Sequence, residues 1–223
     1  MLKKITSFVA AVTFASVASA GATYGFTGIT NNNAGDTAIG EAQLSVELIM
    51  SSGQVEFLFK NAGPDASSMV QLYWEDKTGV LSSLSNWSTT TPVGVNFDGG
   101  SAKPGHLPGS NPKIDDFSIQ AYSPKGKPKD ELVVKGKAPN GVGPNEDVSI
   151  FFSYTNDYSD VLEAIDNGDL VIGVHVQAFK SGGSESFVTG GTPTPPTGIP
   201  SPTAAIAGLG LMSLLVSRRR RRD

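Results

Sequence analysis

The side chains best suited to chemistry are carboxylates, and eight of the 21 occur in four close pairs. The pairs are Glu75 with Asp76, Asp115 with Asp116, Asp157 with Asp160, and Asp166 with Asp169. A glycosidase needs two carboxyl groups that face each other across a cleft, whereas adjacent residues of a strand point to opposite faces. We therefore interpret most of these pairs as helix caps and turns. A Ca²⁺ site at Asp157, Asp166 or Asp169 remains an alternative, because Ca²⁺ takes oxygen ligands, although no EF-hand spacing is present.

Two further sets of residues could carry chemistry, and neither has the right pattern. His106 and His175 are far apart and the chain has no Cys, so a zinc site with three or four ligands is not expected. We expect His175 to face the more polar side of its strand. Ser110–Lys113 matches S-x-x-K and Lys77–Gly79 matches K-T-G, but their order is reversed relative to penicillin-recognising enzymes and Pro112 interrupts the first. The sequence predicts no catalytic residues, no cofactor and no enzyme activity.

Aromatic side chains leave a carbohydrate-binding role open. Tyr73, Trp74, Trp87 and Tyr122 could stack on sugar rings, although core positions are commoner for aromatic residues. Trp74 fits an inward-facing set, whereas Trp87 lies in a Ser/Thr-rich segment. Trp87 is therefore the candidate for glycan contact.

The charges divide the chain unevenly. Its 223 residues carry 17 basic and 21 acidic side chains, and all five Arg are consecutive near the end. Setting aside Lys3, Lys4 and the five Arg leaves ten Lys, and setting aside Asp223 leaves 20 acidic residues. A body of about −10 repels phosphate backbones, so nucleic acid is not an expected partner. Without Cys, disulfides cannot stabilise it.

Residues 1–20 have the pattern of a secretory signal peptide. Lys3 and Lys4 precede an apolar stretch that ends at Val17, and Ala18 and Ala20 form an A-x-A cleavage site before Gly21. The apolar stretch is shorter than the roughly 20 residues that span a bilayer. The sequence therefore predicts export and removal of this segment rather than an N-terminal anchor.

The C-terminal end combines three features in a fixed order. A Gly/Thr/Pro linker covers residues 190–203 and contains Ile199, Pro200, Ser201 and Pro202; an apolar segment follows at 204–217. The chain closes with Arg218, Arg219, Arg220, Arg221, Arg222 and Asp223. Because positive residues stay on the cytoplasmic side, this order predicts a short transmembrane helix with the body outside and residues 218–223 inside.

This order of features resembles the PEP-CTERM sorting signal of bacteria that make an exopolysaccharide matrix. Both Pro of the usual Val-Pro-Glu-Pro motif match Pro200 and Pro202, and Ser201 stands where that motif has an acidic residue. The resemblance implies that an exosortase-type membrane protease cuts near the motif, after transient residence in the inner membrane. The body would then reach the cell surface or extracellular matrix, with exopolysaccharide as a possible partner. A permanent single-pass anchor is the alternative.

Residues 21–189 alternate apolar and polar positions between turn clusters, which predicts an all-β body. A hairpin is expected over Ala42–Lys60, with inward positions Leu44, Val46, Leu48, Val55, Phe57 and Phe59. Further strands are expected at Met69–Trp74 (inward Val70, Leu72 and Trp74), Val93–Phe97, Phe117–Tyr122, Glu131–Lys135, Val148–Tyr154 and Leu170–Phe179. Lys103–Pro112 reads as a surface loop.

One short helix is expected where Tyr158, Val161, Leu162 and Ile165 follow helical spacing, with Asp157 as N-cap and Gly168 after its end. The run from Phe57 to Trp74, this helix with its Gly168, and the strand from Ile172 that leads to Phe187 are similar to bodies of uncharacterised type on other PEP-CTERM proteins. We therefore predict a β-sandwich, jelly-roll or immunoglobulin-like, with a structural or interaction role.

Overall fold

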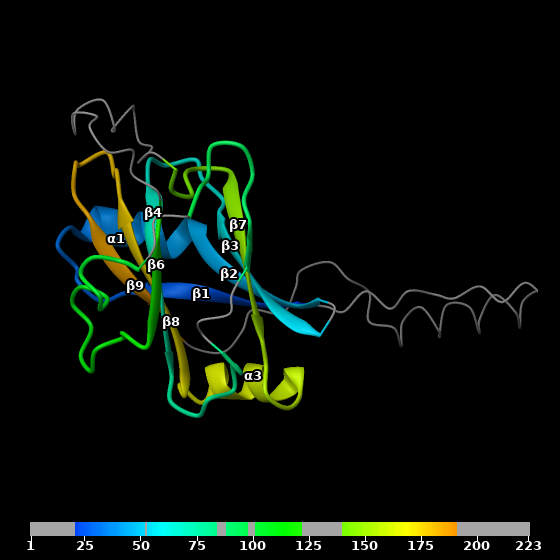
Figure 1. Cartoon of the computed structure of the whole chain (residues 1–223). Helices are drawn as coiled ribbons and strands as arrows, with labels where there is room; N and C mark the ends of the chain where they lie inside the picture. The colour runs from blue at the N-terminus through cyan, green and yellow to red at the C-terminus, as the bar shows by residue number, and fades with distance from the viewer. Residues whose placement is uncertain (1–20, 52, 84–87, 98–100, 122–139, 191–223) are drawn as a thin grey trace, which may run out of the picture.

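The computed structural model describes residues 21–51, 53–83, 88–97, 101–121 and 140–190. Figure 1 shows the arrangement of the elements that these residues form. The predicted signal peptide, Trp87, the strand expected at Glu131–Lys135, and the linker, apolar segment and Arg cluster beyond residue 190 lie outside the described residues. Those predictions are therefore neither confirmed nor contradicted by the fold.

The described body is built from antiparallel strands with two helices. The strands are β1 (Ala22–Gly28), β2 (Leu44–Ser51), β3 (Gln54–Asn61), β4 (Ser68–Asp76), β5 (Ser88–Thr90), β6 (Phe117–Gln120), β7 (Glu146–Ser153), β8 (Leu170–Gln177) and β9 (Glu185–Thr189); the helices are α1 (Ala34–Gln43) and α3 (Tyr158–Asp166). The strands form one sheet in the order β5-β7-β3-β2-β1-β9-β8-β4-β6. The prediction of an all-β body is confirmed, but the strands form one continuous curled sheet rather than two separate ones.

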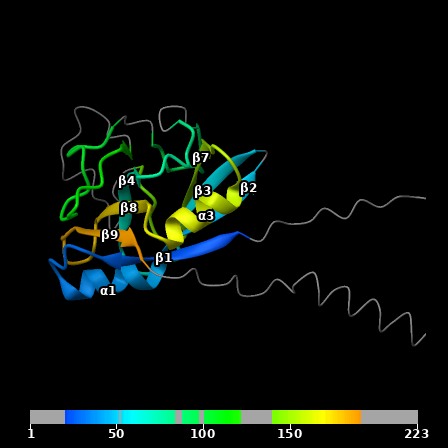
Figure 2. The same ribbon diagram turned by 90° about the horizontal axis from the view of Figure 1, so that it is seen from below.

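Strand β1 belongs to both halves of this sheet. Its first part pairs with β2, from Ala22 opposite Leu48 to Gly25 opposite Ser45. Its second part, from Phe26 to Gly28, pairs with β9 instead. We call the strands β5, β7, β3 and β2 the β3 half and the strands β9, β8, β4 and β6 the β8 half. Figure 2 shows β1 running between them.

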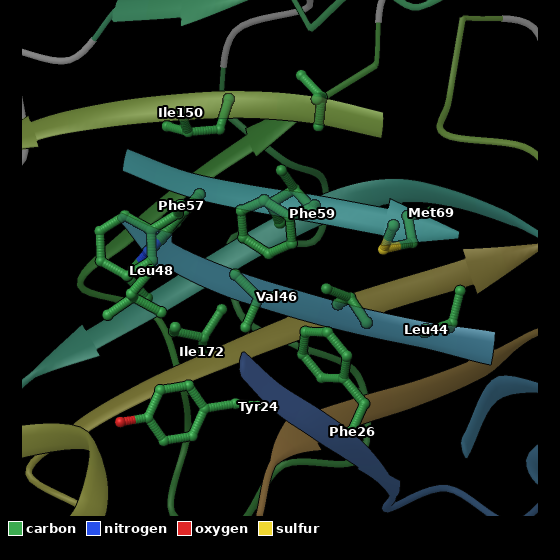
Figure 3. Packing of buried hydrophobic residues seen from close by; sticks show 14 of the residues in the cluster. Tyr24, Phe26, Leu44, Val46, Leu48, Phe57, Phe59, Met69, Ile150 and Ile172 are labelled. Carbon is green, nitrogen blue, oxygen red and sulfur yellow. The ribbon is translucent and has the colours of Figure 1, made fainter. Parts of the chain in front are cut away.

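The sheet curls until the two halves face each other across an aromatic core. Trp74 of β4 is fully buried, and its ring lies 5.7 Å from that of Phe59 in β3 and 5.2 Å from that of Phe152 in β7. Strand β4 is far from β3 and β7 in the sheet order, so these contacts require the curl. Figure 3 shows side chains of both halves, among them Phe57 and Ile172, in this shared interior.

The predicted hairpin is confirmed, although it begins at Leu44 because Ala42 and Gln43 belong to α1. Strands β2 and β3 pair from Leu44 opposite Asn61 to Ser51 opposite Gln54. All the side chains predicted to face inward are buried: Leu44, Val46, Leu48, Val55, Phe57 and Phe59. Strict alternation set this register, because a slip of one residue would expose the whole apolar face.

The prediction for β4 was partly wrong. Leu72 and Trp74 lie in the core as expected, but Val70 is only partly buried and Met69 takes the inward place. The pairing of β4 with β8 shifts between Met69 and Gln71, which marks a β-bulge at Val70. A bulge inserts one residue and so reverses the alternation on one side of it.

Smaller differences concern strand ends. Residues 93–97 form no strand; Val95 makes an isolated bridge with Asn140. Strand β8 ends at Gln177 rather than Phe179, because Ala178 has a left-handed backbone with φ of 61°. The predicted loop at Lys103–Pro112 is confirmed.

The predicted helix is confirmed as α3. The backbone N–H of Asp157, its N-cap, donates to Oδ2 of Asp160 at 3.4 Å, and Gly168 beyond its end has φ of +75°. The Tyr24 hydroxyl of β1 donates to Oδ1 of Asp166 at 3.1 Å. Helix α3 is thereby tied to the strand that joins the two halves.

Helix α1 was not predicted. Its sequence, AGDTAIGEAQ, contains only one large apolar residue, Ile39, so it has no clear apolar stripe. It begins at Asn33, whose side chain accepts from the N–H groups of Gly35 and Asp36 at 2.9 and 3.3 Å. It packs closely against β9 because Gly40 has no side chain. A Cβ at Gly40 would lie 2.1 Å from Cζ of Phe187.

A buried carboxylate holds the connection between β1 and α1. Glu185 of β9 is 1% exposed, and it accepts from the Thr30 hydroxyl at 2.5 Å and from the N–H groups of Asn32 and Asn33 at 3.0 and 2.6 Å. These three donors satisfy a charge that would be costly to bury alone.

Replacing Glu185 should therefore destabilise the fold. In Glu185→Gln the side-chain NH₂ would face backbone donors, and we expect a loss of about 1–3 kcal/mol in the free energy of unfolding. Glu163→Gln is the matched control, because Glu163 is exposed on α3. Urea denaturation would measure both; equal midpoints for the two variants would contradict the role given to Glu185.

Candidate functional site

A long loop crosses the outer face of the β8 half and covers part of it. Residues 101–116 connect toward β6, and three of their side chains, Ala102, Leu107 and Ile114, are buried with Tyr73 of β4. Ile29, Val171 and Val188 pack against this second cluster. The β8 half therefore carries apolar contacts on both faces.

The loop reaches the sheet because Gly173 of β8 has no side chain. A Cβ at Gly173 would lie 2.6 Å from Cδ2 of Leu107, which is fully buried. The loop closes on itself through the Leu107 N–H, which donates to the Ile114 carbonyl at 3.0 Å. Ser110 supports this closure: its hydroxyl donates to the Leu107 carbonyl at 2.7 Å and accepts from the Ile114 N–H at 3.2 Å.

Tyr73 and Gln71 attach the start of the loop to β4. The Tyr73 hydroxyl lies 2.8 Å from Oε1 of Gln71 and 3.0 Å from the Pro104 carbonyl, and Nε2 of Gln71 donates to the Lys103 carbonyl at 2.9 Å. Burial raises the pKa of Tyr73 to about 12. The phenol therefore stays neutral and hydrogen-bonded at ordinary pH.

Beside the loop lies a groove of about 310 Å³. Its floor is aliphatic, made by Ile29 after β1, Val188 of β9, Val171 of β8 and Ile114 of the loop; its rim consists of Glu75, Lys77, Gly109, Ser110, Asn111, Pro112 and Lys113. A groove with an apolar floor and a few polar groups at its rim is the usual form of a small-molecule site. This groove is the candidate functional site.

Several rim groups are already engaged. The Lys77 ammonium donates to the Gly168 carbonyl at 2.8 Å. Oε2 of Glu75 accepts from the Asp115 N–H at 3.1 Å. Lys113 is exposed, and no hydrogen bond or ion pair joins its ammonium to any residue that the structure describes. Lys113 is therefore the rim cation whose ammonium has no partner among the described residues.

The structure brings together the residues of the two enzyme-like motifs. Ser110, Lys113 and Lys77 all line the groove, although the sequence analysis gave S-x-x-K and K-T-G no role. No hydrogen bond joins the Ser110 hydroxyl to either ammonium within the described part of the chain, and its proton is directed to the Leu107 carbonyl. As placed here, Ser110 is not activated as a nucleophile.

Several of the paired carboxylates accept hydrogen bonds from backbone N–H groups, as expected for turns and caps. The Asp76 carboxylate accepts from the N–H groups of Gly79, Val80 and Leu81 at 2.8 to 3.1 Å, and Asp116 accepts from the Asp76 N–H at 2.9 Å. Across the residues that the structure describes, no group of three or more His, Cys, Asp and Glu could hold a metal ion. Asp157, Asp166 and Asp169 therefore form no such group among these residues.

His175 lies on the outer face of β8, as predicted. Its neighbours Val174 and Val176 point into the core, while Nδ1 of His175 lies 3.1 Å from the Ser186 hydroxyl. Burial lowers the pKa of His175, and the nearby Glu185 charge opposes this in part. His175 is a half-buried structural residue, and the site residues Trp87 and Ser201 lie outside the described parts.

The chain matched no protein-family profile, no curated protein and no solved structure. Within the described ranges, neither helix has the length and apolar character needed to span a bilayer.

We expect Gly173→Ala to displace the loop. The added methyl would press on Leu107, so the free energy of unfolding should fall by about 1–3 kcal/mol and limited proteolysis should cut faster within residues 101–116. Gly25→Ala is the control, since Gly25 lies in β1 with no atom within 4 Å of an added Cβ. A Gly173 variant as stable and protected as the Gly25 variant would contradict this packing.

Three tyrosines, two of them buried and one partly buried, should titrate late. Burial raises the pKa of Tyr73 and Tyr158 to about 12, and burial with the neighbouring Asp166 raises that of Tyr24. Because each folded pKa exceeds the ordinary value of 10.0, their contribution to stability is complete below about pH 10 and is lost as the pH rises toward 12.

Absorbance at 295 nm during an alkaline titration would measure the ionisation of these tyrosines. In Tyr73→Phe the late component should shrink by one tyrosine, and a native chain that ionised every tyrosine near pH 10 would contradict it.

Proposed function

We propose that this chain is an exported surface or matrix protein, sorted by a PEP-CTERM-like C-terminal signal and processed by an exosortase-type membrane protease. The observation that carries the proposal is the order of features at the two ends. An N-terminal segment with an A-x-A site is matched by a C-terminal Pro motif, apolar segment and Arg cluster. Each end on its own predicts the same orientation.

The length of the apolar segment favours processing over permanent anchoring. As a helix, the 13 residues from Ala204 to Val216 would span about 20 Å, against a hydrocarbon core of about 30 Å. Such a span holds a protein in the membrane weakly unless flanking Arg stems reach the interface. A permanent anchor is therefore the less favoured outcome.

The fold is compatible with processing at both ends. Gly21 directly precedes β1, and β9 ends at Thr189, just before the linker. Thr189 pairs with Phe26, so the chain enters and leaves the body on neighbouring strands. Removal of the segments before Gly21 and after the Pro motif would leave every described strand intact.

The role that we propose for the body is structural or interactive rather than catalytic. In this proposal the two facing halves form a β-sandwich of the jelly-roll or immunoglobulin-like kind, joined along one side by β1. The groove beside the 101–116 loop offers a binding surface to a ligand or partner. The net negative charge of the body favours solubility outside the cell.

The Pro motif gives the sharpest test. We expect the double variant Pro200→Ala and Pro202→Ala to accumulate in the inner membrane with its C-terminus intact. The matched control carries Pro193→Ala and Pro195→Ala, two linker positions outside the motif, and should be processed like the natural chain. Intact mass of the exported and membrane-bound protein would identify the species.

The natural chain should be recovered outside the cell with Gly21 first and its last residue near Pro200. A full-length C-terminus retained in the membrane in the natural chain would show a permanent anchor instead. Recovery of the body in the cytosol would overturn the proposal altogether.

A further inference from the structure

We propose that the groove beside the 101–116 loop binds a short aliphatic anion: a chain of a few carbons in the groove with a carboxylate or phosphate head at Lys113. This assigns a ligand class to the groove and goes beyond the sorting function. It concerns the folded body alone and holds whether or not the C-terminal tail is cut.

The floor specifies the aliphatic part of the ligand. Ile29, Val171 and Val188 are half-buried although they pack against the second cluster, so apolar surface remains open to water in the groove. Among the described residues that line the groove none is aromatic, so these residues offer no stacking face for a sugar ring. A volume of about 310 Å³ lies near the lower end of the range for small-molecule sites, which fits a short chain.

The rim specifies the charge. Acidic residues outnumber Lys by about two to one in the body, yet the lining holds Lys77 and Lys113 against Glu75. The Glu75 carboxylate already accepts from a backbone N–H, and so does the carboxylate of nearby Asp116. Asp115 is the remaining acidic neighbour along the loop, and it is exposed to solvent. An anionic head is the group that Lys113 can pair with.

The site is already shaped without a ligand. Leu107 is fixed against Gly173, and the loop is closed by the hydrogen bond between Leu107 and Ile114. Ser110 holds the turn at the rim through both of its hydrogen bonds. A preformed groove loses little conformational entropy on binding, which favours measurable affinity for a small ligand.

Calorimetric titration of the full chain in lipid nanodiscs, with the heat from empty nanodiscs subtracted, tests the proposal. Octanoate and octyl phosphate should bind, while octanol and octyltrimethylammonium should bind up to about fivefold more weakly, as expected for one exposed ion pair. If both anions bind, the site recognises the negative charge of the head group. If only one binds, the site distinguishes a carboxylate from a phosphate.

Two variants and their controls locate the site. Lys113→Glu should weaken octanoate binding by at least about fivefold, whereas Lys180→Glu, at another exposed lysine, should not. Val188→Thr replaces one methyl of the floor with a hydroxyl and should weaken binding by about fourfold, whereas Val93→Thr, at a fully exposed valine, should have no effect.

Three results would overturn the proposal. They are no binding of either anion, equal binding of octanol and octanoate, and loss of affinity in the two control variants to the same extent as in the groove variants. None of these results depends on where the protein is found in the cell, so failure here is distinct from failure of the sorting function.

Discussion

The structure depends on one strand that pairs in turn with two different partners. Over its first residues β1 completes the β3 half, and from Phe26 onward it completes the β8 half. The pairing of β1 is what links the two halves into one sheet, and the sheet must curl for Trp74 to reach Phe59 and Phe152. Aromatic contacts then hold the curl closed from inside. Helix α3 secures the same strand through Tyr24, so removal of β1 would affect both halves and the helix at once.

The packing on the outer face of the β8 half depends on a second constraint, the absence of a side chain at Gly173. An open sheet face with Val171 and Val188 would expose apolar surface, and the 101–116 loop covers part of it by placing Leu107 over the glycine. The covering is incomplete, and the uncovered part is the groove. The groove is therefore a product of how the loop packs, rather than a cleft between domains or at a sheet edge. Its polar rim comes from the loop and from the end of β4.

The sequence predicted the elements whose structure depends on residues close together in the chain. Alternation predicted the β2–β3 hairpin and its buried side chains, and helical spacing with Asp157 and Gly168 predicted α3. Helix α1 was missed because its packing depends on Gly40 meeting Phe187, a contact from the far end of the chain. The bulge at Val70 and the curl through β1 are likewise set by pairing with distant strands. The groove could not be predicted for the same reason: Ile29, Ile114 and Val188 lie far apart in sequence, and no periodicity links them.

The strand that joins the halves is also the one nearest to the predicted signal cleavage site. If the signal peptide is removed as proposed, Gly21 becomes the first residue and β1 begins at the next one. Gly21 is itself buried, and a Cβ there would lie 2.7 Å from the Leu48 carbonyl oxygen of β2. A signal peptide held in the membrane therefore leaves almost no free chain between the bilayer and the centre of the sheet. On the proposed export, the closure that depends on β1 would be favoured once the signal has been removed. Export and folding would then be coupled at Gly21, and this coupling would follow from the sheet order rather than from any feature of the signal itself.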